Sequence, residues 1–181
     1  MSRTFFYFAY CTNMLSNRME CCVGKNVRRV RSAKLEDYKL MFGQFSPIYY
    51  GTLPTIVKEC DCQVWGSLWE VPECLKPKLD ELMGVPSKIY KPLTVMMQSE
   101  KSRGGLFEAY TYQLNETPAK PDTINGLWKM KFRPSKIYHD DLIEGAEEAC
   151  LPVYYRRWIR QIPNNGYTGS VKPDLEDNSE L

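Results

Sequence analysis

The order of its segments constrains the fold of this chain more than any other feature. Extended apolar segments fill most of the first 114 residues, and two long helical segments follow near the end. Strands and helices that are segregated along the chain are typical of α+β domains, whereas α/β domains alternate them. We therefore expect an α+β domain around a small mixed, barrel-like β-sheet with flanking helices.

The strand predictions rest on aromatic and β-branched residues. Residues 5–10 (FFYFAY) and 63–71 (QVWGSLWEV) have this composition, and residues 27–43 alternate apolar with charged side chains. Residues 89–97 and 106–114 are expected to pair across the polar loop 98–105.

Helices are expected wherever apolar residues recur at helical spacing. A short helix at 15–22 follows a sharp turn at 11–15. Pro72 opens a helical stretch in which Pro77 delays regular helix and Gly84 ends it. The long helices are 135–149 and 151–162. The second carries a stripe that we expect to face the core, composed of Val153, Tyr154, Trp158 and Ile162.

The length of 181 residues suits one domain, which we place at residues 1–171. Residues 172–181 form a polar, acidic C-terminal tail that is expected to be disordered. The chain contains no internal repeat.

The charge balance argues against a polyanionic partner, since the formal net charge is only +2. Two basic stretches, 25–34 (KNVRRVRSAK) and 154–160 (YYRRWIR), resemble single-strand binding patches. In the first, charges alternate with valines as on a strand with one solvated face, and the second carries the core stripe. We therefore expect no nucleic-acid partner. No segment has the ~18 apolar residues of a membrane helix, so no membrane partner is expected.

Seven cysteines and no N-terminal export pattern predict reduced thiols and a cytoplasmic protein. The adjacent Cys21 and Cys22, and Cys60 and Cys62 one residue apart, lack the C-x-x-C spacing of zinc sites. His139 is the only histidine, so a histidine-based triad or metal site could use at most this residue. We expect no metal, and we place His139 on a solvated helix.

Five stretches together resemble the γ-glutamylcyclotransferase family, in the family's order and with similar spacing. They are YFAYCTNML (7–15), AKLEDYKLMFG (33–43), VWGSLWEV (64–71), LDELMGVPSKIY (79–90) and GYTGSV (166–171). The resemblance implies a small mixed β-barrel with flanking helices, often present as a homodimer.

The resemblance also implies a reaction that uses no cofactor. The α-amine of a γ-glutamyl dipeptide attacks its own γ-carbonyl, 5-oxoproline forms, and a free amino acid leaves. One carboxylate deprotonates the attacking amine and then protonates the leaving amine. Because the attack is intramolecular, proximity supplies much of the remaining rate enhancement. The implied partner is a small anionic ligand such as a γ-glutamyl compound.

The family's substrate loop provides backbone N–H groups for the charged end of the substrate, and its pocket tyrosines orient the glutamyl part. For the tyrosines taken singly, a half-buried ring with a hydrated hydroxyl is an alternative in a chain with 12 tyrosines. The substrate-binding residues implied by the resemblance are Tyr7, Phe8, Ala9, Tyr10, Cys11, Thr12, Asn13, Tyr90, Tyr112 and Tyr138.

The chain departs from the family at the catalytic acid, because Met83 occupies the position of the Glu in the family's L-D-x-x-E-G segment. A thioether cannot exchange protons near pH 7, and general acid–base catalysis is worth about 10²- to 10⁴-fold. In the loop, the family's Gly is Cys11 and its Ser is Thr12. Asp80, three residues back on nearly the same helical face, is a possible surrogate. Glu81 is predicted to point about 200° away from Met83 at ~100° per residue.

Three functions follow from this departure. The preferred one is a catalytically impaired or inactive homologue that retains a pocket for a small anionic ligand or binds a protein partner. The alternative is an active γ-glutamylcyclotransferase with Asp80 or Cys11 as its base. The third is an interaction module whose pocket has collapsed around Met83 and Cys11.

Overall fold

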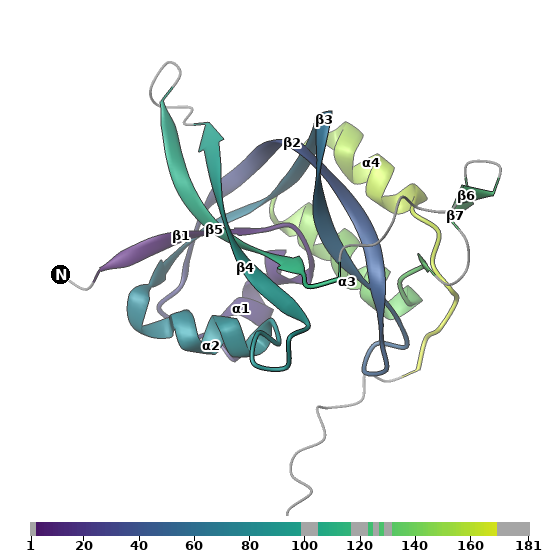
Figure 1. The fold of residues 1–181 in the computed structure, drawn as a ribbon, viewed down its shortest axis with the longest axis horizontal. Helices are drawn as coiled ribbons and strands as arrows, with labels where there is room; N and C mark the ends of the chain where they lie inside the picture. Colours follow the sequence, from purple (N-terminus) through teal and green to yellow (C-terminus); the bar gives the residue numbers. More distant parts are fainter. Residues whose placement is uncertain (1–2, 99–104, 117–122, 125–126, 129–131, 170–181) are drawn as a thin grey trace, which may run out of the picture.

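The computed structural model describes residues 3–98, 105–116, 123–124, 127–128 and 132–169. Its main element is a five-stranded sheet with the strand order β2-β3-β1-β5-β4 (Figure 1). Two short strands, β6 (Thr123–Ile124) and β7 (Leu127–Trp128), form a separate pair. The strands of the main sheet are β1 (Thr4–Ala9), β2 (Arg28–Ser46), β3 (Gly51–Pro72), β4 (Tyr90–Gln98) and β5 (Leu106–Leu114).

The sheet is mixed and open. Its central strand β1 pairs antiparallel with β3 over six residues, but parallel with β5 at a single position, Tyr7 opposite Tyr110. A closed barrel requires the two outer strands to pair, and here β2 and β4 are the two edges. The expected α+β class and flanking helices are confirmed, and "barrel" describes the sheet only loosely.

Strands β2 and β3 form an antiparallel hairpin that is longer than expected. The predicted strands at 27–43 and 63–71 are present, but residues 51–62 also belong to β3. The polar stretch 58–61 within them is exposed. Lys58 pairs with Tyr38 on β2, and residues 59–62 fall at the register shift before Gln63 pairs with Glu36. This part of the strand covers no core, so its sequence lacks the apolar alternation that would have identified it.

The helices lie around the sheet, and the predicted short helices are found close to their expected bounds. The helical elements are η1 (Thr12–Met14), α1 (Ser16–Cys22), η2 (Glu73–Leu75), α2 (Lys76–Leu82), α3 (Lys136–Glu148) and α4 (Val153–Gln161). No helix in the described ranges is long and apolar enough to cross a membrane.

Helix α2 ends as the sequence predicts. Gly84 has a φ of +64°, and its N–H donates to the Glu81 carbonyl at 2.8 Å. The Val85 N–H donates to the Asp80 carbonyl at 2.9 Å. This pair of bonds is the Schellman motif, which favours glycine in the left-handed position.

The core stripe predicted for α4 is wrong at Val153, Tyr154 and Trp158, and right at Ile162, which is buried. Tyr154 is 54% exposed and Trp158 is 38% exposed, whereas Tyr155 and Ile159 are buried. Both sets of residues fit the helical period, so spacing alone does not determine which set faces the core.

His139 on α3 is buried rather than solvated. Its Nε2 lies 2.8 Å from the Ile159 carbonyl on α4, and its Nδ1 lies 3.2 Å from Asn164 Nδ2. Both ring nitrogens therefore have structural partners that connect α3 to α4. The predicted tail at 172–181 and most of the predicted loop at 98–105 lie outside the described residues.

Candidate functional site

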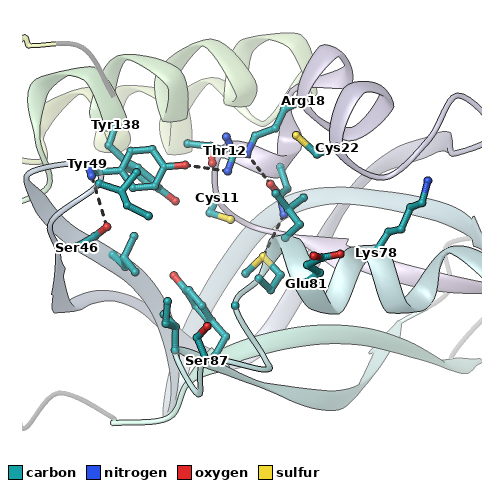
Figure 2. Close-up of a pocket in the computed structure, with 18 residues that line it drawn as sticks. Cys11, Thr12, Arg18, Cys22, Ser46, Tyr49, Lys78, Glu81, Ser87 and Tyr138 are labelled. Carbon is teal, nitrogen blue, oxygen red and sulfur yellow. Dashed lines mark hydrogen bonds between the residues drawn. The ribbon is translucent and has the colours of Figure 1, made fainter. Parts of the chain in front are cut away.

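A cleft of about 580 Å³ lies where four parts of the chain meet (Figure 2). Its walls come from the loop and helix at 11–22, the β2–β3 turn region at 46–53, the end of α2 and following turn at 78–90, and Tyr138 on α3. Helix α3 approaches the loop closely at Gly145, where an added Cβ would lie 3.1 Å from the Met14 Cβ. A cleft lined by several distant segments is a typical ligand site.

Asn13 is the centre of a hydrogen-bond network in the cleft wall. Its Nδ2 donates to the Tyr7 hydroxyl at 3.0 Å and to the Met83 sulfur at 3.2 Å. Its Oδ1 accepts from Arg18 Nε at 2.9 Å, and Arg18 Nη2 donates to the Tyr49 hydroxyl at 2.8 Å. The network fixes the orientation of the Asn13 amide, since the carbonyl oxygen must face Arg18.

Met83 lines the cleft directly after the last residue of α2, and its side chain is buried. Glu81 lines the same cleft (Figure 2), although helical geometry predicts that it points away from Met83. Met83 is the C-cap of α2, with φ −86° and ψ 2°, and its N–H donates to the Leu79 carbonyl at 3.1 Å. Both residues line the cleft, and the angle between their side chains stays a prediction.

Asp80 lies outside the lining of the cleft. Its carboxylate accepts a hydrogen bond from the Tyr112 hydroxyl at 2.6 Å and a longer one from Tyr110 at 3.5 Å. Burial and the neighbouring Asp80 raise the pKa of Tyr110 to about 12. In this arrangement the Asp80 carboxylate is bonded to tyrosines of β5.

Half of the predicted substrate-binding residues line the cleft, namely Cys11, Thr12, Asn13, Tyr90 and Tyr138. The others, which lie in the core beside it, are Tyr7, Phe8, Ala9, Tyr10 and Tyr112.

Two of the predicted tyrosines use their hydroxyls for structure. Tyr10 donates to the Tyr112 carbonyl at 2.7 Å, and Tyr90 donates to the Pro54 carbonyl at 2.6 Å. Both hydroxyls already have protein partners. Tyr90 therefore contributes its ring, rather than its hydroxyl, to the wall of the cleft.

The Cys11 thiol is poorly suited to act as a base. Its side chain is buried, and burial raises its pKa above the ordinary thiol value despite the nearby Arg18 guanidinium. A thiolate is therefore scarce near neutral pH. Within the described ranges, no group of three or more His, Cys, Asp and Glu side chains is arranged to hold a metal ion.

The residues that the sequence interpretation missed are those that carry charge into the cleft: Arg18, Lys78 and Glu81, together with Tyr49. One signal was available for Arg18. It lies one turn into the helix that begins directly after the 11–15 loop, so its side chain can reach back to Asn13.

A model of the AIG2-like family matches residues 63–159, which is more than half of the 181 residues. The chain belongs to the AIG2-like family. This AIG2-like chain is 29% identical to a γ-glutamylcyclotransferase of Bos taurus over 180 residues, covering 96% of the chain and 87% of the relative. The γ-glutamylcyclotransferase of Homo sapiens is also 29% identical, over 178 residues and with the same coverage.

Two solved cyclotransferase structures share the fold of this AIG2-like chain. A γ-glutamyl cyclotransferase structure superposes with a TM-score of 0.79 at 28% identity, covering 93% of this chain and 94% of the other. A yeast cyclotransferase specific to glutathione shares the fold, with a TM-score of 0.59 at 10% identity, covering 88% and 94% of the two chains. The resemblance to γ-glutamylcyclotransferases is thereby confirmed.

Proposed function

We propose that this protein is a γ-glutamylcyclotransferase homologue that keeps the ligand cleft but is catalytically impaired. The observation that carries the proposal is the place of Met83. Its sulfur lies at the cleft wall, 3.2 Å from Asn13 Nδ2, at the position that the family resemblance assigns to the catalytic acid. Similarity to curated γ-glutamylcyclotransferases over 96% of the chain supports the general function.

The chemistry explains why Met83 matters. Ring closure requires a group that removes a proton from the α-amine and then protonates the leaving amine. A thioether accepts the Asn13 N–H bond, but it cannot exchange a proton. The expected loss is about 10²- to 10⁴-fold in rate, while the walls formed by residues 11–13, Tyr90 and Tyr138 remain available for binding.

The second candidate function is an active cyclotransferase, and Glu81 is the observation that favours it. Among the described residues that line the cleft, Glu81 is the one with a carboxyl group. Its side chain is exposed. Asp80 and Cys11 are weaker surrogates, since Asp80 is bonded to Tyr112 and is not among the residues that line the cleft, and burial raises the pKa of Cys11.

The deciding experiment measures 5-oxoproline release from γ-glutamyl-alanine by the purified protein. We expect the unmodified protein to be slow, Met83→Glu to be about 10- to 100-fold faster, and Met83→Gln to show no gain, because an amide cannot transfer the proton. Met83→Glu should also be less stable, since the new carboxylate is mostly buried. Rapid turnover by the unmodified protein that is lost in Glu81→Gln would instead establish the active alternative.

The proposal includes a small anionic γ-glutamyl compound as ligand, a cytoplasmic location and a homodimeric state. A protein partner is a further part of the proposal. The open cleft beside Met83 and Cys11 disfavours the third interpretation, a pocket that has collapsed around these two residues.

A further inference from the structure

Arg18 and Lys78 are the cationic cleft residues whose charges the proposed function leaves unused, and Arg18 is the less exposed of the two. It projects from α1 toward the cleft between Asn13 and Tyr49 (Figure 2). Its two bonded partners, the Asn13 Oδ1 and the Tyr49 hydroxyl, are both neutral groups. A guanidinium has five N–H donors, and these two bonds use two of them.

No carboxylate forms an ion pair with Arg18 among the described residues. The described ion pairs involve other cations, namely Arg28, Arg29, Lys34, Lys136 and Arg160. Asp141 on α3 interacts electrostatically with Arg18 but forms no hydrogen bond with it. Burial raises the pKa of the Asp141 carboxyl. A cation held inside a cleft wall without a bonded anion is costly unless a ligand supplies one.

We propose that Arg18 binds a carboxylate group of the ligand. The planar guanidinium matches a carboxylate in a two-bond arrangement that lysine cannot reproduce. Apolar side chains on the other walls of the cleft, including Ile48, Leu53 and Ile89, suit a short aliphatic body next to that carboxylate. The ligand class is therefore a small aliphatic carboxylate. Its more specific identity as a γ-glutamyl compound rests on the proposed function.

The surroundings of Arg18 hold the guanidinium in one orientation before a ligand arrives. Asn13 fixes Nε and Tyr49 fixes Nη2. The Tyr49 ring packs edge-on against Tyr138, with the ring centroids 4.9 Å apart. Such preorganisation reduces the entropy lost on binding. We therefore expect Tyr49→Phe to weaken carboxylate binding, but by less than a substitution that removes the Arg18 charge.

The test is calorimetric titration of the full chain with γ-glutamyl-alanine, glutarate and the uncharged analogue glutaramide. We expect Arg18→Met to bind γ-glutamyl-alanine and glutarate about 10- to 100-fold more weakly, and Arg18→Lys to be intermediate. Arg28→Met, which removes an exposed cation outside the cleft, should bind as the unmodified protein does. The preference of the unmodified protein for glutarate over glutaramide should disappear in Arg18→Met.

The outcomes separate this inference from the proposed function. Equal binding of γ-glutamyl-alanine by the unmodified protein and Arg18→Met overturns the role of Arg18 and leaves the proposed function standing. Binding of glutarate that depends on Arg18, without binding of γ-glutamyl-alanine, supports the role of Arg18 and contradicts the proposed ligand. No binding of either carboxylate at millimolar concentration overturns the inference. Should Arg18→Met not fold, Arg18→Lys decides it: a smaller preference for glutarate over glutaramide than in the unmodified protein supports the inference, and an unchanged preference overturns it.

Discussion

Asn13 links the loop after β1 to the end of α2 through one side chain. Its amide N–H groups point at Tyr7 and Met83, and its carbonyl points at Arg18. Position 83 must therefore present an acceptor to Asn13, a condition that a thioether and a carboxylate both meet. The network explains how a methionine can occupy this position without disturbing the loop.

Glu148 is the residue for which the structure predicts a pH-dependent contribution to stability. Its carboxylate accepts from the Ser16 N–H at 3.2 Å and from Arg29 at 2.8 Å. Burial alone would raise the pKa of Glu148, but these donors outweigh it, so the pKa lies below the ordinary value. A lowered pKa means that the stabilisation is complete above the unfolded pKa of about 4.3 and is lost as the pH falls through the folded value.

We expect Glu148→Gln to lower the free energy of unfolding by about 0.5–1 kcal/mol at pH 7. The effect is small because the Glu148 side chain is partly exposed. The difference from the unmodified protein should shrink to nothing well below pH 4, where both side chains are neutral. Urea unfolding at the two pH values measures this, with Glu20→Gln on the exposed face of α1 as the control. A difference that is constant with pH would contradict the charge-based explanation.

At the scale of elements, the end of α2 positions both Glu81 and Met83. The turn depends on Gly84, whose φ of +64° is unfavourable for other residues and whose added Cβ would lie 2.9 Å from Ile89 Cδ1. The Schellman bonds end the helix at its C-cap, Met83, and both Met83 and Glu81 line the cleft at this end.

Gly84→Ala is expected to reduce the free energy of unfolding by about 1–2 kcal/mol because alanine disfavours the left-handed region. Gly84→Asn should lose less, since asparagine tolerates that region better. Thermal unfolding of the two variants checks the order. An alanine variant as stable as the asparagine variant would mean that backbone strain is not the cause.

The sequence was most informative where one residue type determines the local backbone. Pro72 and Gly84 bracket the helical stretch correctly, and the aromatic strands are found where their composition places them. The exposed part of β3 and the buried face of α4 escaped prediction, because each depends on which neighbour packs there. For the same reason the sequence grouped Cys11, Thr12 and Asn13 but did not place Arg18 and Tyr49 beside them, since that contact joins α1 to the β2–β3 turn.

At the scale of the whole molecule, the two parts of the sheet meet at a short junction. Strand β1 pairs with β5 at one backbone position, and the buried Thr111 hydroxyl adds a hydrogen bond to the Phe8 carbonyl at 2.8 Å. The side chains of Tyr7 and Tyr112 pack across the same junction, with ring centroids 5.8 Å apart. At this junction, side-chain contacts therefore provide much of the stabilisation that backbone hydrogen bonds provide between the other strands of the sheet.

Thr111→Val keeps the shape of the side chain and leaves the Phe8 carbonyl without this donor. We expect a loss of about 1–2 kcal/mol in the free energy of unfolding, with one urea transition retained. Thr94→Val, on the exposed face of β4, should change stability by less than about 0.5 kcal/mol. Two separate transitions in Thr111→Val would show that the hairpin β2–β3 and the pair β4–β5 unfold independently.

The walls of the cleft are widely scattered along the chain, and this has a consequence for any shortened form of the protein. Residues 63–159, the stretch that matches the family model, include neither Asn13, Arg18 nor Tyr49. They also omit β1, the strand that joins the two parts of the sheet. A fragment limited to that stretch would still match the family model, but it would lack the strand that joins the two parts of the sheet and the Asn13–Arg18–Tyr49 network of the cleft wall.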